Sequence, residues 1–304
     1  MRSIQSLRPP ILALALACLV SLVYSQIPLQ VGYAVISADP GRDLPVGTAL
    51  FSSSDAQGVL VWEAGVAAVK PISSGRIFVE QQGNGKTALA LVNPSATPLS
   101  VTLVLRNESG NEVARTDPPR EFGPGEHQAL FVDQLFPNLG DFTGSLTFQT
   151  QQTAQQLAAV TLRQNTNLDG TAIFATLPVV DLTEPATTDS VIFPQVGAGV
   201  GLSTQLVLIN ASQEAVGGQI RLFGSSGVPL ELALDGVVGS TFTYQIEGNG
   251  TFRGELTRST GLGVGYAVVT LNQGSQTPAG SAIFQFTSGE SVISEAGVLS
   301  VQPT

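Results

Sequence analysis

Apolar and polar residues alternate along most of the chain with a period of two. Residues 101–106 read VTLVLR, so valine and leucine fill every second position, and the turn-forming sequence NESGN follows at 107–111. Residues 220–227, IRLFGSSG, repeat this arrangement. Strands of about four to eight residues bounded by turns are typical of antiparallel β-sandwiches. Because a single turn near 132–136 is the one helix-like candidate, we expect an all-β fold.

One pentapeptide occurs three times, as GTALF, GTAIF and GSAIF at 47–51, 170–174 and 280–284. A phosphate-binding loop would need a following helix and a lysine, which these segments lack. We interpret the pentapeptide as a strand signature in which glycine admits a tight corner and phenylalanine fills the core. The framework residues predicted in this way are Gly47, Phe51, Gly170, Phe174, Gly280 and Phe284.

Longer stretches of the chain repeat as well. Residues 31–51 overlay 264–284 without a gap, and Glu-Ala-Gly-Val follows in both copies, at 63–66 and 295–298. The two later copies also share a front half: TALALVNPS at 87–95 answers TQLVLINAS at 204–212, and FTGSLT at 142–147 answers FRGELT at 252–257. A repeated sequence indicates a repeated structural unit, so these repeats predict the architecture even before single strands are assigned.

These repeats predict two tandem immunoglobulin-like sandwiches preceded by the back half of a third. We place the partial repeat at 26–70 and the full repeats at 71–183 and 188–302. Short linkers are expected at 71–75 and 183–189, where proline and polar residues cluster.

The partial repeat is expected to form three strands with one apolar face, around Val31 to Val35, Leu50 or Phe51, and Val59 to Val61. Three strands cannot cover such a face alone, and their edge invites pairing. The half repeat could pack on the first full repeat, accept strands from another molecule, or be the remnant of a longer protein. Our hypothesis is that this segment is an assembly or docking surface.

The first 25 residues resemble a secretory signal peptide. Arg2 and Arg8 precede the apolar run 11–23, and Ser25 is the expected cleavage site. The apolar run is too short to span a bilayer of about 30 Å. A lipoprotein start at Cys18 is the alternative, although no good lipobox precedes it. We therefore predict a secreted or surface-displayed protein that does not remain inserted in a membrane.

Composition and charge narrow the function classes further. The formal net charge is −10, and the one cysteine would leave with the signal peptide. The mature chain would then lack disulfides, a thiol nucleophile and thiolate metal ligands. An acidic chain does not favour nucleic acid or anionic lipid as a partner, since both require clustered lysine and arginine.

The sequence NTNLDG contains the one pattern that suggests a metal. Asn165, Asn167 and Asp169 place side-chain oxygens at alternate positions before Gly170, as calcium loops do. The twelfth position of such a loop would be Thr176, which cannot supply the closing bidentate carboxylate. A hairpin turn with Asp-Gly explains the same residues, so no cofactor is predicted.

Two further patterns suggest catalysis but do not support it. Glu63 and Glu295 recur at the same repeat position, yet a glycosidase needs two acids flanking one bond. His127 is the one histidine, and the sequence has no Gly-x-Ser-x-Gly elbow to supply a nucleophile. We expect the glutamates to bind strand-end N–H groups, the histidine to lie in an exposed turn, and the protein not to be an enzyme.

Trp62 is the one aromatic candidate for ligand binding. It occupies the position that Ser294 holds in the last repeat, so the framework tolerates a polar group there. Partial exposure would make the indole a stacking platform for a sugar ring. The alternative interpretation is that Trp62 shields the incomplete half repeat.

The sequences "TQLVLINAS", "GSSGVPLEL" and "AGSAIF…VISEAGV", with "FGPGEHQALFVDQLFP" in the middle repeat, resemble tandem immunoglobulin-like or fibronectin-like repeats of bacterial secreted and cell-surface proteins. The resemblance covers nearly all of residues 30–301 and rests on framework residues. It implies a structural or adhesive role at the cell surface, with other protein chains or surface polymers as partners and possible self-association through residues 26–70. An extracellular carbohydrate-binding protein is the alternative.

Overall fold

The computed structural model describes residues 32–302, so the expected signal peptide at 1–25 and Val31 lie outside the described residues. Every strand described below lies within residues 35–304. Its elements are almost all antiparallel strands, which confirms the all-β sandwich fold. The single helix among the described residues, α1 (Val132–Leu135), is one turn long and lies where a turn was predicted.

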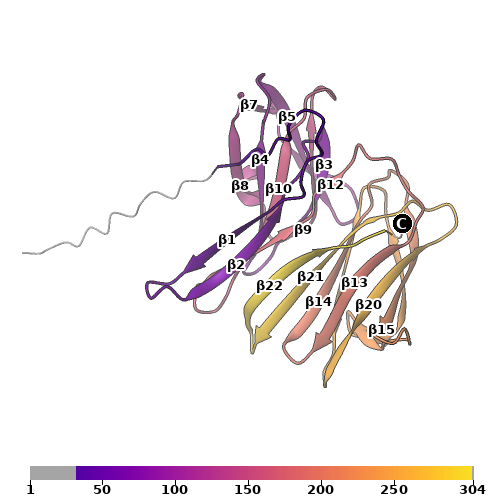
Figure 1. The fold of residues 1–304 in the computed structure, drawn as a ribbon. Coiled ribbons are helices and arrows are strands. Elements are labelled where there is room, and N and C mark those ends of the chain that lie inside the picture. Colours follow the sequence, from indigo (N-terminus) through magenta and orange to yellow (C-terminus); the bar gives the residue numbers. More distant parts are fainter. Residues whose placement is uncertain (1–31, 303–304) are drawn as a thin grey trace, which may run out of the picture. The chain divides into compact units, whose positions relative to one another are not determined.

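The N-terminal sandwich consists of two sheets (Figure 1). One has the strand order β11-β10-β4-β8, and the other has the order β12-β3-β9-β5-β6, with β7 also paired to β5. Between them, every second residue of β5 is fully buried, as the alternating sequence predicts. The strands are β3 (Ser74–Gln81), β4 (Gly85–Val92), β5 (Leu99–Asn107), β6 (Glu112–Arg115), β7 (Arg120–Phe122), β8 (His127–Phe131), β9 (Phe142–Thr150), β10 (Ala158–Thr166), β11 (Ala172–Leu177) and β12 (Val180–Asp181).

The C-terminal sandwich is a single sheet folded into two layers. One layer has the order β22-β21-β14-β19-β16-β17, the other has the order β13-β20-β15-β18, and they join where Gly199 pairs with Leu202. Leu206 and Leu208 of β14 point into the core between the layers. The strands are β13 (Val191–Gly199), β14 (Leu202–Ile209), β15 (Val216–Gly224), β16 (Leu232–Leu234), β17 (Val237–Gly239), β18 (Thr241–Ile246), β19 (Thr251–Thr257), β20 (Leu262–Leu271), β21 (Ala279–Ser288) and β22 (Ser291–Leu299).

Equivalent asparagines end β4 and β14 and show that the front halves of the two sandwiches correspond. The side chains of Asn93 and Asn210 are buried, and each Nδ2 donates to three backbone carbonyls. Each Oδ1 accepts the N–H group two residues ahead. The carbonyls belong to Thr97, Phe122 and Gly123 in the first case and to Glu214, Ile246 and Glu247 in the second.

The back halves correspond differently from the sequence overlay. In sheet order, β9 matches β20, because each lies between the first and third strands of its sandwich. Gly144 and Gly265 occupy the same place in these strands, and a Cβ on either would lie about 2 Å from a neighbouring carbonyl oxygen, at 2.1 and 1.9 Å. FTGSLT lies in β9 whereas FRGELT lies in β19, so their predicted equivalence is wrong.

The middle pentapeptide also occupies a different strand position from its two twins. In GTALF, Gly47 directly precedes β1 (Thr48–Ser54) and the other four residues lie within it, while GSAIF lies entirely in β21. Each of these strands is the first strand of a hairpin. Residues 170–174 instead enter β11, the second strand of the hairpin β10–β11. Gly170 lies in the turn before β11 with φ +87°. The similarity therefore reflects the shared chemistry of entering a strand and not an equivalent place in the fold.

The three phenylalanines of the pentapeptides do not share one environment. Phe284 packs against the core of the C-terminal sandwich, as predicted. Phe51 is 38% exposed, and Phe174 packs on Trp62 and not in a core cluster, so the prediction that both fill a core is wrong. The glycines differ as well: a Cβ on Gly280 would lie 2.8 Å from the ring of Phe193, whereas one on Gly47 would meet side chains at 3.3 Å or more.

The partial repeat forms two strands and not three. β1 pairs with β2 (Leu60–Ala67) in a separate two-stranded sheet, and residues 32–47 contain no strand. Residues 264–268, the sequence twin of 31–35, lie in β20 between β13 and β15. The partial repeat has no counterparts of β13 and β15 among residues 32–70, and without such partners a strand has no ladder to join.

Candidate interaction surface

Each repeat ends in a hairpin of the same kind: β1–β2, β10–β11 and β21–β22. Strand pairing shows that each hairpin has two faces, which we call face A and face B. Face A contains Leu50, Glu63 and Gly65 in the first hairpin, Leu162, Phe174 and Thr176 in the second, and Ile283, Glu295 and Gly297 in the third. Face B contains Phe51, Trp62 and Ala64, then Arg163, Ile173 and Ala175, then Phe284, Ser294 and Ala296.

The three hairpins stack on one another, with β11 lying against both β22 and β2. Face A of β21–β22 covers face B of β10–β11, where Glu295 binds Arg163. Ile283 joins Leu177 in one apolar cluster at this contact. The strands approach so closely that a Cβ on Gly297 would lie 1.9 Å from the carbonyl oxygen of Thr176.

The second contact repeats the first with other side chains. Face A of β10–β11 meets face B of β1–β2, where the ring centroids of Phe174 and Trp62 lie 4.9 Å apart. Thr176 Oγ1 donates to the carbonyl of Gly65 at 2.6 Å. The ring of Trp62 is also in edge contact with Phe51, at 6.2 Å between centroids. The partial repeat therefore packs on the first sandwich through face B, which was one of the three expected outcomes.

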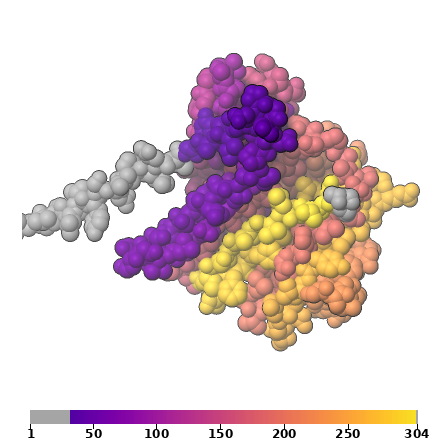
Figure 2. All heavy atoms as spheres, viewed as in Figure 1, coloured from indigo at the N-terminus to yellow at the C-terminus, as the bar shows by residue number. Residues whose placement is uncertain are grey.

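The stack leaves face A of β1–β2 uncovered at one end and part of face B of β21–β22 uncovered at the other. At the first end, on face A of β1–β2, Leu50 is 68% exposed and Glu63 and Gly65 are exposed as well. At the other end, face B of β21–β22 is covered in part, because Ala282 and Phe284 pack on the core of their own sandwich, while Phe286 is 47% exposed and Ala296 is exposed. Figure 2 shows both hairpins, in purple and yellow, at the surface of the molecule.

A buried ionic network joins the two sandwiches beside the stack. Arg163 Nε donates to Glu295 at 2.8 Å, and its Nη1 donates to Glu80 of β3. The side chains of Arg163, Glu80 and Glu295 are only 5%, 7% and 0% exposed. Arg253 Nη1 donates to the second oxygen of Glu80 at 2.7 Å. Burial opposes the charged form of Arg163, but the carboxylates of Glu295 and Glu80 outweigh it and raise the pKa of the guanidinium.

A second buried arginine fixes the interface from the side of β3. Arg76 donates to Thr147 Oγ1 at 2.9 Å within its own sandwich. Across the interface it donates to the carbonyl of Asn210 at 2.8 Å and to Asn249 Oδ1 at 2.9 Å. Burial, together with the charge of Arg106, lowers the pKa of Arg76 to about 10. The two sandwiches are thus held by directional contacts as well as by apolar packing.

Sequence reasoning did not single out Arg163, Glu80 or Arg76. A usable signal was nevertheless present, because Arg163 shares one face of its strand with the buried residues Ala159 and Thr161. A charge in line with core positions of a strand requires a partner in the interior.

Trp62 gives a direct readout of how the partial repeat docks. Changing Phe174 to Ala should shift the fluorescence emission of Trp62, the single tryptophan, to longer wavelength, because its ring loses its nearest aromatic cover. Phe223→Ala is the matched control, since Phe223 stacks on Tyr266 in the C-terminal sandwich. An unchanged spectrum for Phe174→Ala would contradict the contact.

The residues of the calcium candidate form a hairpin turn. Gly170 N–H donates to the carbonyl of Asn167, and Thr171 N–H donates to Oδ1 of both Asn167 and Asp169. Hydrogen bonds from the side chain and backbone of Thr171 lower the pKa of Asp169. Asn165 lies in β10, with its side chain buried. Across residues 32–302, no cluster of three or more His, Cys, Asp or Glu side chains is placed to hold a metal ion.

The structure separates the two repeated glutamates. Glu63 is exposed on β2 while Glu295 is buried, and Glu295 binds the side chains of Arg163 and Gln285. The role expected for Glu295, binding strand-end N–H groups, is therefore not the one observed. His127 begins β8 and is partly buried, so its placement in an exposed turn is wrong.

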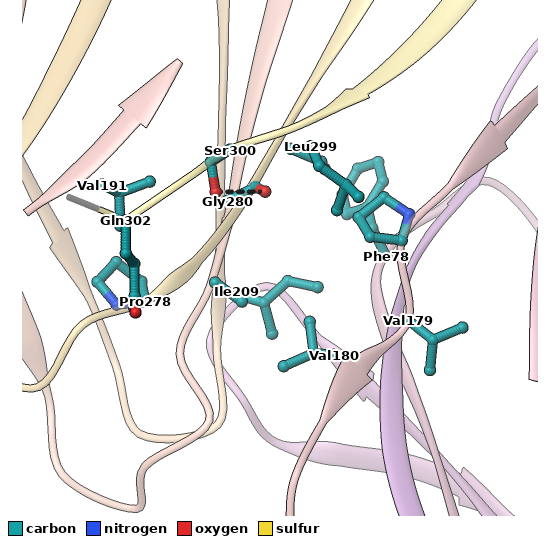
Figure 3. Close-up of a pocket in the computed structure, with 13 residues that line it drawn as sticks. Phe78, Val179, Val180, Val191, Ile209, Pro278, Gly280, Leu299, Ser300 and Gln302 are labelled. Atoms are coloured by element: carbon teal, nitrogen blue, oxygen red, sulfur yellow. Dashed lines mark hydrogen bonds between the residues drawn. The ribbon is translucent and has the colours of Figure 1, made fainter. Parts of the chain in front are cut away.

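A cavity of about 230 Å³ lies between the two sandwiches (Figure 3). Phe78, Val180 and Ile209 give it an apolar lining, and the Ser300 hydroxyl donates to the carbonyl of Gly280 at 2.8 Å. None of its lining residues titrates near neutral pH. The cavity therefore offers no general acid, general base or charged nucleophile.

Comparisons with known proteins place the chain in no family. No family model matches it, and neither does any curated protein or solved structure. Within residues 32–302, no helix is both long enough and apolar enough to span a membrane.

Proposed function

We propose that this chain is a non-catalytic, secreted or cell-surface β-sandwich repeat protein with a structural or adhesive role, and that it assembles through its partial repeat. The observation that carries the proposal is the pair of twin faces. Face A of β21–β22 is buried against another sandwich, whereas face A of β1–β2 presents Leu50, Glu63 and Gly65 to solvent. An exposed copy of an interface fits a protein that binds further modules.

Other features of the described residues also support a structural role. The buried charged residues Arg76, Glu80, Arg163 and Glu295 join the two sandwiches. The cavity lined by Phe78, Val180 and Ile209 is mostly apolar and lies inside that joint. The sequence pattern of residues 1–25, which resembles a secretory signal peptide, supports the proposed extracellular location.

Light scattering on residues 26–304 tests the assembly role. We expect the mass to rise with protein concentration and to return to that of a monomer in Leu50→Lys, because a charge at this exposed position disrupts apolar docking without altering a core. Val113→Lys, at an exposed position on β6, is the matched control and should behave like the parent chain. A parent chain that stays monomeric at all concentrations would contradict assembly.

Carbohydrate binding is the second candidate function, favoured by the aromatic group formed by Trp62, Phe51 and Phe174. Phe51 leaves part of this group open to solvent, and aromatic surfaces of this kind bind sugar rings. Titration of the protein with soluble polysaccharides should then quench or shift Trp62 fluorescence. An invariant spectrum across the series would exclude a platform at this position.

A further inference from the structure

We infer that a second copy of this chain continues the hairpin stack head to tail, so that face A of β1–β2 in one copy docks on face B of β21–β22 in the next. The inference rests on the proposed assembly role and specifies its geometry. The occupant of each open face is then the opposite end of another copy.

One kind of contact occurs twice inside the molecule. Face A of a hairpin packs on face B of the preceding hairpin twice, through Glu295 on Arg163 and through Phe174 on Trp62. At the ends of the stack, face A of β1–β2 and the part of face B of β21–β22 around Phe286 and Ala296 are exposed. A copy placed by the same rule would bring Leu50 and Gly65 of one chain against Ala296 of another.

The open faces are suited to such a contact. Leu50 and Val61 are exposed on face A, and Phe286 and Ala296 are exposed on face B. Within the four strands concerned, Glu63 and Glu295 are the only charged residues, and proline does not occur. Natural sheets protect open edges with lysine, proline or bulges, and here a single bulge in each hairpin, at Ser53/Ser54 and at Phe286/Thr287, supplies that protection.

One difference from the internal contacts sets the strength of association. Glu63 corresponds to Glu295, but Phe284 occupies in the acceptor hairpin the position that Arg163 holds in β10. The carboxylate of Glu63 thus lacks the buried arginine that Glu295 has, and each chain carries a formal net charge of −10. Both effects weaken docking, so we expect reversible assembly that strengthens as salt screens the repulsion.

The symmetry of the contact determines the product. Because faces A and B are different surfaces, their pairing is heterologous, and unless the rotation closes a ring it produces an open chain of copies. A face that paired with itself would stop at a dimer. The mass distribution therefore distinguishes the two arrangements.

Two variants that each block one end provide the test. Leu50→Lys removes the docking capacity of face A, and Ala296→Lys removes that of face B, both at exposed strand positions. We expect light scattering to show growing oligomers for the parent chain and monomers for each variant alone. An equimolar mixture should form a one-to-one dimer and nothing larger, since it retains one intact face of each kind.

Two other outcomes would contradict the head-to-tail inference. If Leu50→Lys abolishes assembly while Ala296→Lys leaves it intact, the hairpins pair with themselves, and the head-to-tail inference is overturned while the assembly role stands. If neither variant changes the oligomers of the parent chain, both the inference and assembly through the partial repeat are wrong. Thermal unfolding of each variant verifies that it is folded before the masses are compared.

Discussion

Replacing Arg163 with methionine should lower the free energy of unfolding by about 3–5 kcal/mol, the cost of breaking a buried ion pair by removing one partner. Methionine fills a similar volume, so the loss arises from charge and not from a cavity. Glu80 and Glu295 would remain buried, and Glu295 would retain only Gln285 as a side-chain partner. We expect the two sandwiches to separate more readily as well, because Glu295 lies across their interface from Arg163.

Urea unfolding monitored by circular dichroism measures this change. Arg115→Met is the matched control: Arg115 also pairs with a glutamate, Glu112, but on the exposed surface, and its loss should leave the midpoint almost unchanged. Adding Glu80→Gln and Glu295→Gln to Arg163→Met should restore part of the lost stability, since the uncompensated charges disappear. An unchanged midpoint for Arg163→Met alone would show that the network contributes nothing to folding.

The strands that alternation predicts best are those buried on one face between two sheets. In β5, Val101, Leu103 and Leu105 all point into one core, so local pattern and tertiary environment agree. The turn after β5 was also predictable, because Gly110 takes a φ of +81°. Such elements depend on residues close in sequence, which is why the sequence alone was sufficient.

The errors arose where the same local sequence fits two places in a sheet. A glycine, a small residue and a phenylalanine suit any strand that leaves a turn, so GTAIF at 170–174 resembled the first strand of a hairpin although it begins the second. Residues 33–35 carry a strand-like pattern, but a strand also needs neighbours to pair with. Pairing partners are a tertiary property, and the pattern contains no information about them.

The candidate surface was partly foreseen. The sequence led to the hypothesis that the partial repeat is a docking surface, which stays a proposal, and it singled out Trp62. It did not reveal that Trp62 meets Phe174, or that Glu295 meets Arg163, because these partners lie more than a hundred residues apart. The twin glutamates Glu63 and Glu295 looked alike in sequence, and only the stacking of the hairpins separates a buried one from an exposed one.

Gly297 and Gly65 occupy the same repeat position, and replacing each with alanine should change the free energy of unfolding very differently. Gly297→Ala should lower the free energy of unfolding by about 2–3 kcal/mol, at the upper part of the range for overpacking, because its Cβ would lie 1.9 Å from a backbone carbonyl that cannot rotate away. The carbonyl belongs to Thr176 of the neighbouring sandwich. Relieving the clash therefore requires β22 and β11 to move apart.

Gly65→Ala is the matched substitution at the same repeat position. Its Cβ would meet only the side chains of Leu50 and Thr48, at 3.5 and 3.8 Å, so the folded chain can accept it without strain. Alanine also loses less backbone entropy than glycine on folding, so Gly65→Ala should be neutral or stabilising by about 0.5 kcal/mol. Urea midpoints of the two variants measured side by side decide the matter. Equal losses would mean that face A of β1–β2 is already covered in the single chain, which would remove the open face on which assembly depends.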